Sequence, residues 1–151
     1  FVLGPVLSSR SCESVEWVRM FFNCAEITTA FVKNVDPEKG VHSGILSYVD
    51  VRAVAQAHVA GLEKENAKGR YITANTPQFN FKDAAKILSE KYPQYSIPYH
   101  LKEGDEDLVP LEVANDHSKA ERELGVEFLP WEKSLYDMAD SLIARGMIPK
   151  K

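Results

Sequence analysis

The six tyrosines are the first side chains to consider for acid–base chemistry. A tyrosine serves as a general acid when a lysine one helical turn later places its ammonium beside the phenol and lowers the pKa of the phenol. No tyrosine in the sequence has a lysine at that spacing, and the nearest pair is Tyr48 with Arg52. That pair lies where a predicted strand passes into a helix, which is a poor context for a catalytic pair. We therefore expect no catalytic residue in this chain.

Dinucleotide binding needs a glycine-rich turn between a strand and a helix, because the backbone must approach the pyrophosphate at the helix N-terminus. The eight glycines are scattered, and none of them belongs to a G-x-G-x-x-G motif. Gly40 and Gly44 lie in a loop before a predicted strand, which is the wrong context. The chain thus supplies no phosphate-binding turn of this kind.

The histidines, cysteines and acidic residues form no recognisable metal or nucleophile motif. No two histidines have the i, i+4 spacing of a helical zinc site, and no serine stands in a G-x-S-x-G motif. We expect His58 on the apolar face of a helix, packed and bonded to backbone. The acidic run 103–107 lacks the pattern of a calcium loop and is expected to be a solvated surface. Cys12 and Cys24 are too few for a disulfide framework and fit no common zinc spacing, so we expect reduced thiols in a cytoplasmic protein.

Composition places the chain among ordinary globular proteins. Its 151 residues, 44% of them hydrophobic and 26% charged, are enough to bury a sizeable core. The net charge is −4 and the bases form no stripe, so we expect no nucleic-acid partner. The apolar runs are far shorter than the roughly 20 residues that span a bilayer, so we expect no membrane segment. The chain starts at Phe1 without a methionine, and we expect it to begin inside a longer protein.

The first half of the chain alternates between extended and helical patterns. Residues 1–3 are predicted to end a buried strand, because Gly4 and Pro5 then stop extended pairing. Apolar residues at a 3.6-residue spacing predict a helix from Ser14, with Glu13 or Ser14 near its cap. The next predicted elements are a turn at residues 36–40 and a strand at residues 45–49.

The second half begins with a helix that Asp50 is expected to cap and that runs to about Lys64. One apolar face of this helix should be buried, formed by Val51, Val54, Ala55, His58, Val59 and Leu62. The remaining elements are a strand at 70–74 and helices from Asn80 to Pro93, from Asp116 to Gly125, and from Pro130 or Trp131 to Gly146. Strands that alternate with helices predict an α/β protein.

Seven stretches stand in a definite order and spacing along the chain. They are F-V-L-G-P at 1–5, Y-V-D-V-R-A-V-A-Q-A-H at 48–58, G-R-Y-I at 69–72, K-Y-P-Q-Y-S-I-P at 91–98, D-H-S-K-A at 116–120, L-G-V-E-F at 124–128 and G-M-I-P at 146–149. Each is weak alone, but together they resemble the extended short-chain dehydrogenases/reductases, in the subgroup that holds dihydroflavonol reductase, cinnamoyl-CoA reductase and yeast-type methylglyoxal reductase. The resemblance implies the C-terminal, substrate-side portion of an NAD(P)-binding Rossmann-type reductase without its glycine-rich N-terminal half, with residues 1–151 as one unit.

The resemblance also implies roles for individual residues. The family's catalytic Tyr and Lys precede the position of Phe1, and the loop after the Gly-Pro turn closes over the nicotinamide end of the cofactor. Phe1 and Ser14 are implied as cofactor-binding residues, Ser14 toward the phosphates, although capping of its own helix explains Ser14 equally well. Ser47 is implied in substrate binding, where dihydroflavonol reductase has a glutamine; loss of that long amide argues against flavonoid specificity. Ala53 replaces an acid that is usual in the family, which should weaken a local contact at the helix start.

Two functions remain open. The first is part of an NADPH-dependent oxidoreductase that reduces an aldehyde, ketone or dihydroflavonol-like carbonyl to an alcohol. Its partners are the small-molecule substrate and the N-terminal half of the same protein, which binds most of the NADP(H). The alternative is a non-catalytic, truncated binding module. Without the N-terminal half, the apolar faces of the first strand and of the helix from Ser14 should be under-covered, with Val2, Val18 and Phe22 not all buried.

Overall fold

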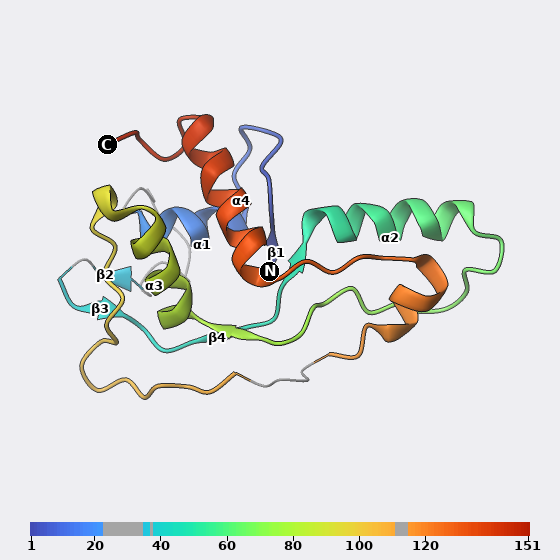
Figure 1. The fold of residues 1–151 in the computed structure, drawn as a ribbon, viewed down its shortest axis with the longest axis horizontal. Helices are drawn as coiled ribbons and strands as arrows, with labels where there is room; N and C mark the ends of the chain where they lie inside the picture. The colour runs from blue at the N-terminus through green and yellow to red at the C-terminus, as the bar shows by residue number, and fades with distance from the viewer. Residues whose placement is uncertain (23–34, 37, 111–114) are drawn as a thin grey trace.

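Two short parallel strands bring the start of the chain against its middle. The computed structural model describes residues 1–22, 35–36, 38–110 and 115–151. β1 (Val2–Leu3) pairs in parallel with β5 (Val49–Asp50), near the centre of the molecule, which confirms the strand predicted at residues 1–3 (Figure 1). The other strands of the described residues pair antiparallel: β2 (Val35–Asp36) with β3 (Gly40–Val41), and β4 (Ile45–Leu46) with β6 (Phe79–Asn80).

The helices begin and end largely where the sequence predicts. Asp50 caps α2 (Val51–Glu63) and Asn80 caps α3 (Phe81–Lys91), each by accepting a backbone N–H of the first turn. Gly125 and Gly146 follow η3 (Ala120–Leu124) and α4 (Trp131–Ala144) with φ of 73° and 71°, the left-handed conformation that favours glycine. The helical elements are α1 (Glu13–Phe21), α2 (Val51–Glu63), α3 (Phe81–Lys91), the 3₁₀ turn η2 (Pro93–Tyr95), the π-helical turn η3 (Ala120–Leu124) and α4 (Trp131–Ala144). The fold is α/β, as predicted.

The start of α1 differs from the prediction. Its N-cap is Cys12, whose side chain makes no capping bond. Ser14 lies inside the first turn, and its Oγ accepts a hydrogen bond from the N–H of Val2 at 3.1 Å. The capping role considered for Ser14 is therefore wrong, because its hydroxyl bonds to β1 instead of to its own helix.

The main core lies between α1, α3 and α4 and is rich in aromatic rings. Trp17 is buried at its centre, with its ring centroid 4.9 Å from that of Phe21 and 5.4 Å from that of Phe81. α1 and α3 both pack against α4. The C-terminal helix of the chain thus covers the helix that follows the first loop.

The packing of α4 tests the expectation that the apolar faces of β1 and α1 are under-covered. Val18 and Phe22 are 0% and 1% exposed, so the expectation is wrong for α1. Val2 is 41% exposed, so it holds for β1. The difference arises because α4 packs on α1, whereas only one edge of β1 pairs with another strand among the described residues.

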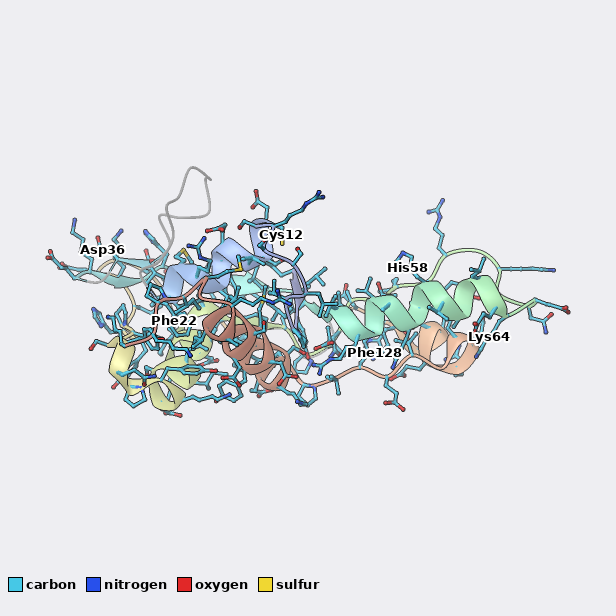
Figure 2. The ribbon with its side chains drawn as sticks, turned by 90° about the horizontal axis from the view of Figure 1, so that it is seen from above. Cys12, Phe22, Asp36, His58, Lys64 and Phe128 are labelled. Carbon is cyan, nitrogen blue, oxygen red and sulfur yellow. The ribbon has the colours of Figure 1, made fainter. Side chains whose placement is uncertain are left out.

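Helix α2 projects away from the main body, with η3 beside it (Figures 1 and 2). The buried face predicted for α2 is wrong: Ala53 is its one buried residue, and Val59 and Leu62 are 54% and 87% exposed. His58 is likewise exposed, although its Nδ1 bonds to the backbone oxygen of Val54 at 2.8 Å as expected of a backbone-bonded histidine. η3 covers one side of the helix only, in a small second cluster of Val49, Ala53, Ala120, Leu124 and Val126.

Two predicted strands also differ. The strand expected at 45–49 is divided, since β4 pairs with β6 and β5 pairs with β1. Residues 70–74 form no strand, although their side chains favour one. A strand needs backbone hydrogen bonds to a neighbouring strand, and these residues have no such partner in the described part of the chain. Local propensity alone was not sufficient here.

The acidic run 103–107 is only partly a solvated surface. The carboxylate of Asp105 accepts a hydrogen bond from the N–H of Ser43 and lies 2.8 Å from Nδ1 of His42. The Ser43 bond, followed by the contact with His42, lowers the pKa of Asp105 below its ordinary value. Asp107 forms an ion pair with a lysine of α3. These contacts attach the run to the main body.

Some predictions concern residues that lie outside the described ones. These are Cys24 and Pro37, the second of which belongs to the predicted turn. Cys12 is an exposed free thiol. None of the described helices is long and apolar enough to cross a bilayer.

Candidate functional site

The candidate site begins at the sharp turn after β1. Gly4 has a φ of 115°, in the region that residues with side chains rarely adopt. A Cβ at this position would lie 2.9 Å from Cγ1 of Val51 and 3.1 Å from Oδ2 of Asp50. The chain therefore passes too close to the start of α2 to admit a side chain. Ligand crevices of parallel sheets form outside the carboxyl ends of the strands, which is where this turn lies.

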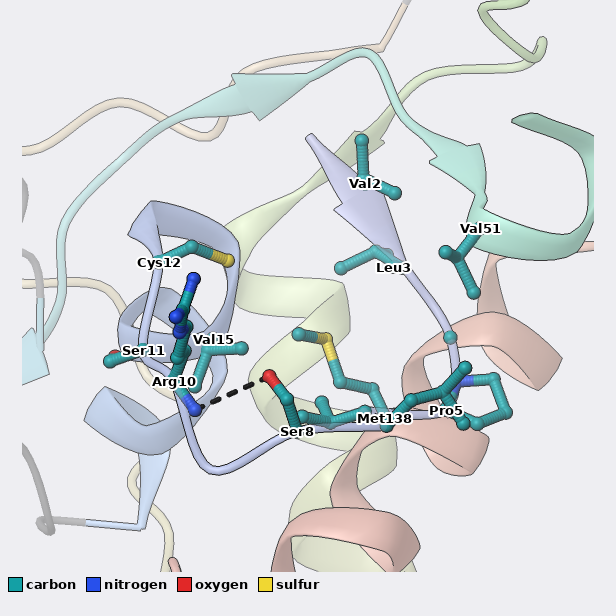
Figure 3. A pocket seen from close by; sticks show the side chains of 13 residues that line it. Val2, Leu3, Pro5, Ser8, Arg10, Ser11, Cys12, Val15, Val51 and Met138 are labelled. Atoms are coloured by element: carbon teal, nitrogen blue, oxygen red, sulfur yellow. Dashed lines mark hydrogen bonds between the residues drawn. The ribbon is translucent and has the colours of Figure 1, made fainter. Parts of the chain in front are cut away.

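A hollow of about 340 Å³ follows the loop from β1 to Cys12 (Figure 3). Val15 of α1, Val51 of α2 and Met138 of α4 line it from the other elements, so its walls are mainly apolar. The loop also contributes Ser8, Arg10 and Ser11, and the N–H of Arg10 donates to Oγ of Ser8 at 3.3 Å. Apolar walls suit a flat ring, and hydroxyl and guanidinium groups suit a phosphate.

Phe1 and Ser14 lie next to this loop. The backbone of Phe1 belongs to the ladder with β5, because its oxygen accepts from the N–H of Val49 at 2.9 Å, and its ring packs on Trp17. The Oγ of Ser14 accepts from the N–H of Val2, and no described residue accepts the hydroxyl proton of Ser14. Neither residue lines the hollow within the described structure, and their contact with a cofactor remains a prediction.

Ser47 joins three segments of the chain. Its Oγ accepts hydrogen bonds from Nε2 of Gln78 at 2.9 Å and from Nδ2 of Asn115 at 3.3 Å. The two amides stand 31 and 68 residues further along the sequence, and no motif connects them with Ser47. Sequence reasoning therefore missed Gln78 and Asn115, since only the folding of these segments onto one another reveals the group.

Tyr48 and Arg52 do not form an acid–base pair. The Tyr48 phenol is buried; it donates to the backbone oxygen of Leu129 at 3.0 Å and accepts from Nδ2 of Asn75 at 2.6 Å. Burial raises the pKa of Tyr48 well above its ordinary value, so this phenol holds its proton. The structure places the tyrosine in a packing role.

Arg52 instead connects the start of α2 with α4. Its Nε and Nη2 donate to the two oxygens of Asp50, each at 2.7 Å, and its Nη2 lies 2.8 Å from Oδ2 of Asp137. Asp50 is 1% exposed, and burial alone would raise its pKa. Hydrogen bonds from Arg52 and Ser134 outweigh that effect, so the pKa lies below the ordinary 3.8. The D-V-R sequence thus has a structural function in this chain.

The hollow therefore offers surfaces for binding, and the Tyr48–Arg52 pair is not arranged for proton transfer. No set of three or more His, Cys, Asp or Glu side chains among the described residues could hold a metal ion. The hollow supplies apolar walls and polar loop groups, while the nearby Tyr48 is buried and hydrogen-bonded. Such a site can bind and orient a ligand.

Parallel strands with a tight glycine turn at their carboxyl ends, flanked by helices, define part of a Rossmann-type α/β protein. Solved structures support this class. Yeast methylglyoxal/isovaleraldehyde reductase Gre2, solved in complex with NADPH, superimposes with a TM-score of 0.67 at 21% identity. The match covers 95% of this chain and 44% of the yeast protein, and at this identity it concerns the fold alone.

Sequence relatives give the family. Cinnamoyl-CoA reductase 2 of Arabidopsis thaliana is 32% identical over 148 residues, which are 98% of this chain and 40% of the relative. The bifunctional dihydroflavonol 4-reductase/flavanone 4-reductase of Malus domestica is 36% identical over 115 residues, 72% of this chain and 31% of the relative. No protein-family model matches the chain. The chain belongs to the cinnamoyl-CoA reductase and dihydroflavonol reductase family, as the resemblance predicted, and spans 40% or less of the length of these two relatives.

Proposed function

We propose that residues 1–151 act as one substrate-side unit of an NADPH-dependent carbonyl reductase. The complete protein reduces an aldehyde, ketone or dihydroflavonol-like carbonyl to an alcohol, and its N-terminal half binds most of the cofactor and supplies the catalytic Tyr and Lys. The observation that carries this proposal is the Gly4 turn against α2 with the apolar hollow beside it, in a chain of this reductase family.

The residues present fit one end of the cofactor. When bound, NADPH supplies the hydride that reduces the carbonyl carbon. The apolar walls of the hollow would receive the nicotinamide end, and Gly4 lets the chain turn tightly against the start of α2 beside it. Ser14 would hold a phosphate oxygen, because its hydroxyl accepts from Val2 and its proton is donated to no described residue. In this arrangement the loop from Gly4 to Cys12 would exclude water from one side of the ring.

The chain by itself contributes no proton to the carbonyl oxygen. General acid catalysis needs a donor with a suitable pKa within hydrogen-bond reach of that oxygen. Tyr48 is buried, bonded on both sides of its phenol oxygen and raised in pKa, so it does not meet this condition. We therefore expect binding and orientation from this unit, and chemistry from the N-terminal half.

The test compares the 151-residue chain with the longer protein that includes the preceding coding sequence. Each is mixed with NADPH and a panel of aromatic aldehydes, methylglyoxal and dihydroflavonols, and NADPH oxidation is followed by absorbance and fluorescence. We expect no oxidation above the no-protein control with the short chain, and substrate-dependent oxidation with the longer protein. Oxidation by the short chain alone would contradict the assignment of the catalytic residues to the N-terminal half.

A non-catalytic binding module is the second candidate. The burial of Val18 and Phe22 favours it, because α4 of this chain covers α1. A preceding reading frame that lacks a glycine-rich turn and a Tyr-x-x-x-Lys sequence, together with no oxidation by either protein, would establish the module and exclude the reductase.

A further inference from the structure

A second hollow lies at the start of α4, apart from the hollow beside the Gly4 turn. Its volume is about 340 Å³, within the range of roughly 300–1,000 Å³ that small-molecule sites occupy. The two hollows share no lining residue. One wall of the second hollow is the connection from η3 to α4, which carries Phe128 and runs from η3 back to the main body (Figures 1 and 2).

Two aromatic rings line the second hollow. Phe128 stacks on His117 with ring centroids 4.1 Å apart, and Trp131 stacks on Phe79 with centroids 4.8 Å apart. Both Phe128 and Trp131 are half-buried, and no further described ring or lysine stacks on either of them. The electron-rich faces of such rings attract cations, and tryptophan does so most strongly.

Glu132 brings a negative charge to the same wall. It is half-buried, and it forms no ion pair and no side-chain hydrogen bond with any described residue. An acid in the first turn of a helix is stabilised by the helix dipole, so Glu132 by itself indicates no ligand. The rings beside it do, because a carboxylate and aromatic faces attract an organic cation together.

The buried polar groups of the wall leave a neutral ligand little to bind. The Tyr48 phenol donates to the backbone oxygen of Leu129 and accepts from Nδ2 of Asn75. The Asn75 amide also donates to Leu129 at 2.7 Å, and its Oδ1 accepts from the N–H of Thr76. Burial, followed by the charge of Glu132, raises the pKa of Tyr48, so the phenol stays neutral. The rings and Glu132 are therefore the groups that select a ligand, and they select positive charge.

We propose that the second hollow binds a small organic ammonium ion, with its alkyl groups against Phe128 and Trp131 and its charge opposite Glu132. An alkylated ammonium suits this wall better than a metal ion, since no three His, Cys, Asp or Glu side chains of the described residues gather to hold a metal. The proposal goes beyond the carbonyl reductase function, because it requires neither the cofactor nor the carbonyl substrate.

Choline and 3,3-dimethylbutan-1-ol test the proposal, because they have the same shape and differ in the charged nitrogen. Each is titrated into the ¹⁵N-labelled 151-residue chain, and the indole N–H signals of Trp131 and Trp17 are followed. Trp17 is buried in the main core and serves as an internal control. Two ring contacts of ordinary strength favour the cation, so we expect choline to bind roughly 5- to 30-fold more tightly and to shift the Trp131 signal alone.

Variants assign the preference to the wall of the second hollow. Glu132→Gln removes the charge with little change of shape, and Phe128→Leu removes a ring, so each should reduce the preference for choline by roughly 2- to 5-fold. Phe128→Tyr keeps the ring and should retain the preference. Glu127→Gln removes an exposed acid from the residue before Phe128 and should leave the preference unchanged. Glu132→Gln breaks no described side-chain contact, so we expect it to fold, and backbone amide spectra check each variant.

Equal affinities of the two compounds, or a preference for choline that survives both Glu132→Gln and Phe128→Leu, would overturn the site. The titration is repeated with the longer protein, where the preference for choline should persist. Its loss there would show that the preceding part of the protein covers the second hollow, and would overturn the small-molecule assignment. None of these measurements uses NADPH oxidation, so the outcome is separate from that of the reductase proposal.

Discussion

The contact between Arg52 and Asp50 should be a major local contribution to the stability of this chain. Asp50 is 1% exposed and receives two hydrogen bonds of 2.7 Å from the Arg52 side chain. Hydrogen bonds to charged groups contribute about 1.5–3 kcal/mol each. The Arg52 side chain is 40% exposed, so solvent screening reduces the pair below the simple sum. We expect Arg52→Ala to lower the free energy of unfolding by about 2–3 kcal/mol.

Urea unfolding followed by circular dichroism measures this change in free energy. Thermal unfolding gives a second measurement: for a chain of this size about 1 kcal/mol corresponds to roughly 2–4 °C, so the Tm should fall by about 4–12 °C. Arg52→Lys should restore only part of the loss, because an ammonium cannot make the two-pronged contact. Arg70→Ala removes an exposed arginine elsewhere and should change stability by about 0.5 kcal/mol or less.

The dependence on pH has a definite sign. The pKa of Asp50 is lower in the folded protein than its ordinary value of 3.8. The ionised Asp50 carboxylate therefore contributes its full share to the free energy of unfolding at pH values above 3.8. The contribution is lost as the pH falls from there through the folded pKa. The difference in free energy of unfolding between the unaltered chain and Arg52→Ala should therefore become smaller as the pH is lowered from 7 to 3. Two results would refute the reasoning. One is a difference in free energy of unfolding that stays constant from pH 7 to 3, and the other is a destabilisation by Arg52→Ala of less than about 0.5 kcal/mol at pH 7.

Three further substitutions test individual elements. Gly4→Ala should lower the free energy of unfolding by roughly 1–3 kcal/mol, measured in urea, because of the positive φ and the approach to Val51; an unchanged midpoint would contradict a close turn. Ser14→Ala should cost about 1 kcal/mol through its lost bond to Val2, and in the longer protein should raise KM for NADPH more than it changes kcat; an unaltered KM removes the cofactor assignment. Asn80→Ala should cost about 1 kcal/mol by thermal unfolding, and a neutral result would show that the α3 cap is dispensable.

Local sequence signals determined much of the fold. Short polar side chains at helix starts bond to nearby N–H groups, so Asp50 and Asn80 identify their helices without tertiary information. Glycines after the last turn identify the helix ends for the same local reason, as at Gly125 and Gly146. The ordered motifs from F-V-L-G-P to G-M-I-P were specific enough to predict the reductase family that the relatives confirm.

The candidate site depended more on tertiary structure. A serine near a helix start satisfies the rules for a cap, and only the position of β1 shows that the Ser14 hydroxyl bonds to Val2 instead. The exposure of Val59 and Leu62 could not be read from their spacing, because periodicity identifies an apolar face and not the element that covers it. Residues 70–74 likewise favour a strand but have no ladder partner among the described residues.

The group around Ser47 illustrates the physical limit most clearly. Gln78 and Asn115 are amides in loop segments, and an amide carries no periodic or motif signal that announces its partner. Their hydrogen bonds exist because β4 pairs with β6 and because the fold brings Asn115 next to Ser47. Sequence determined the local elements and the family, since those depend on neighbours in the chain. Tertiary structure decided which distant polar atoms meet, because that depends on how the elements pack.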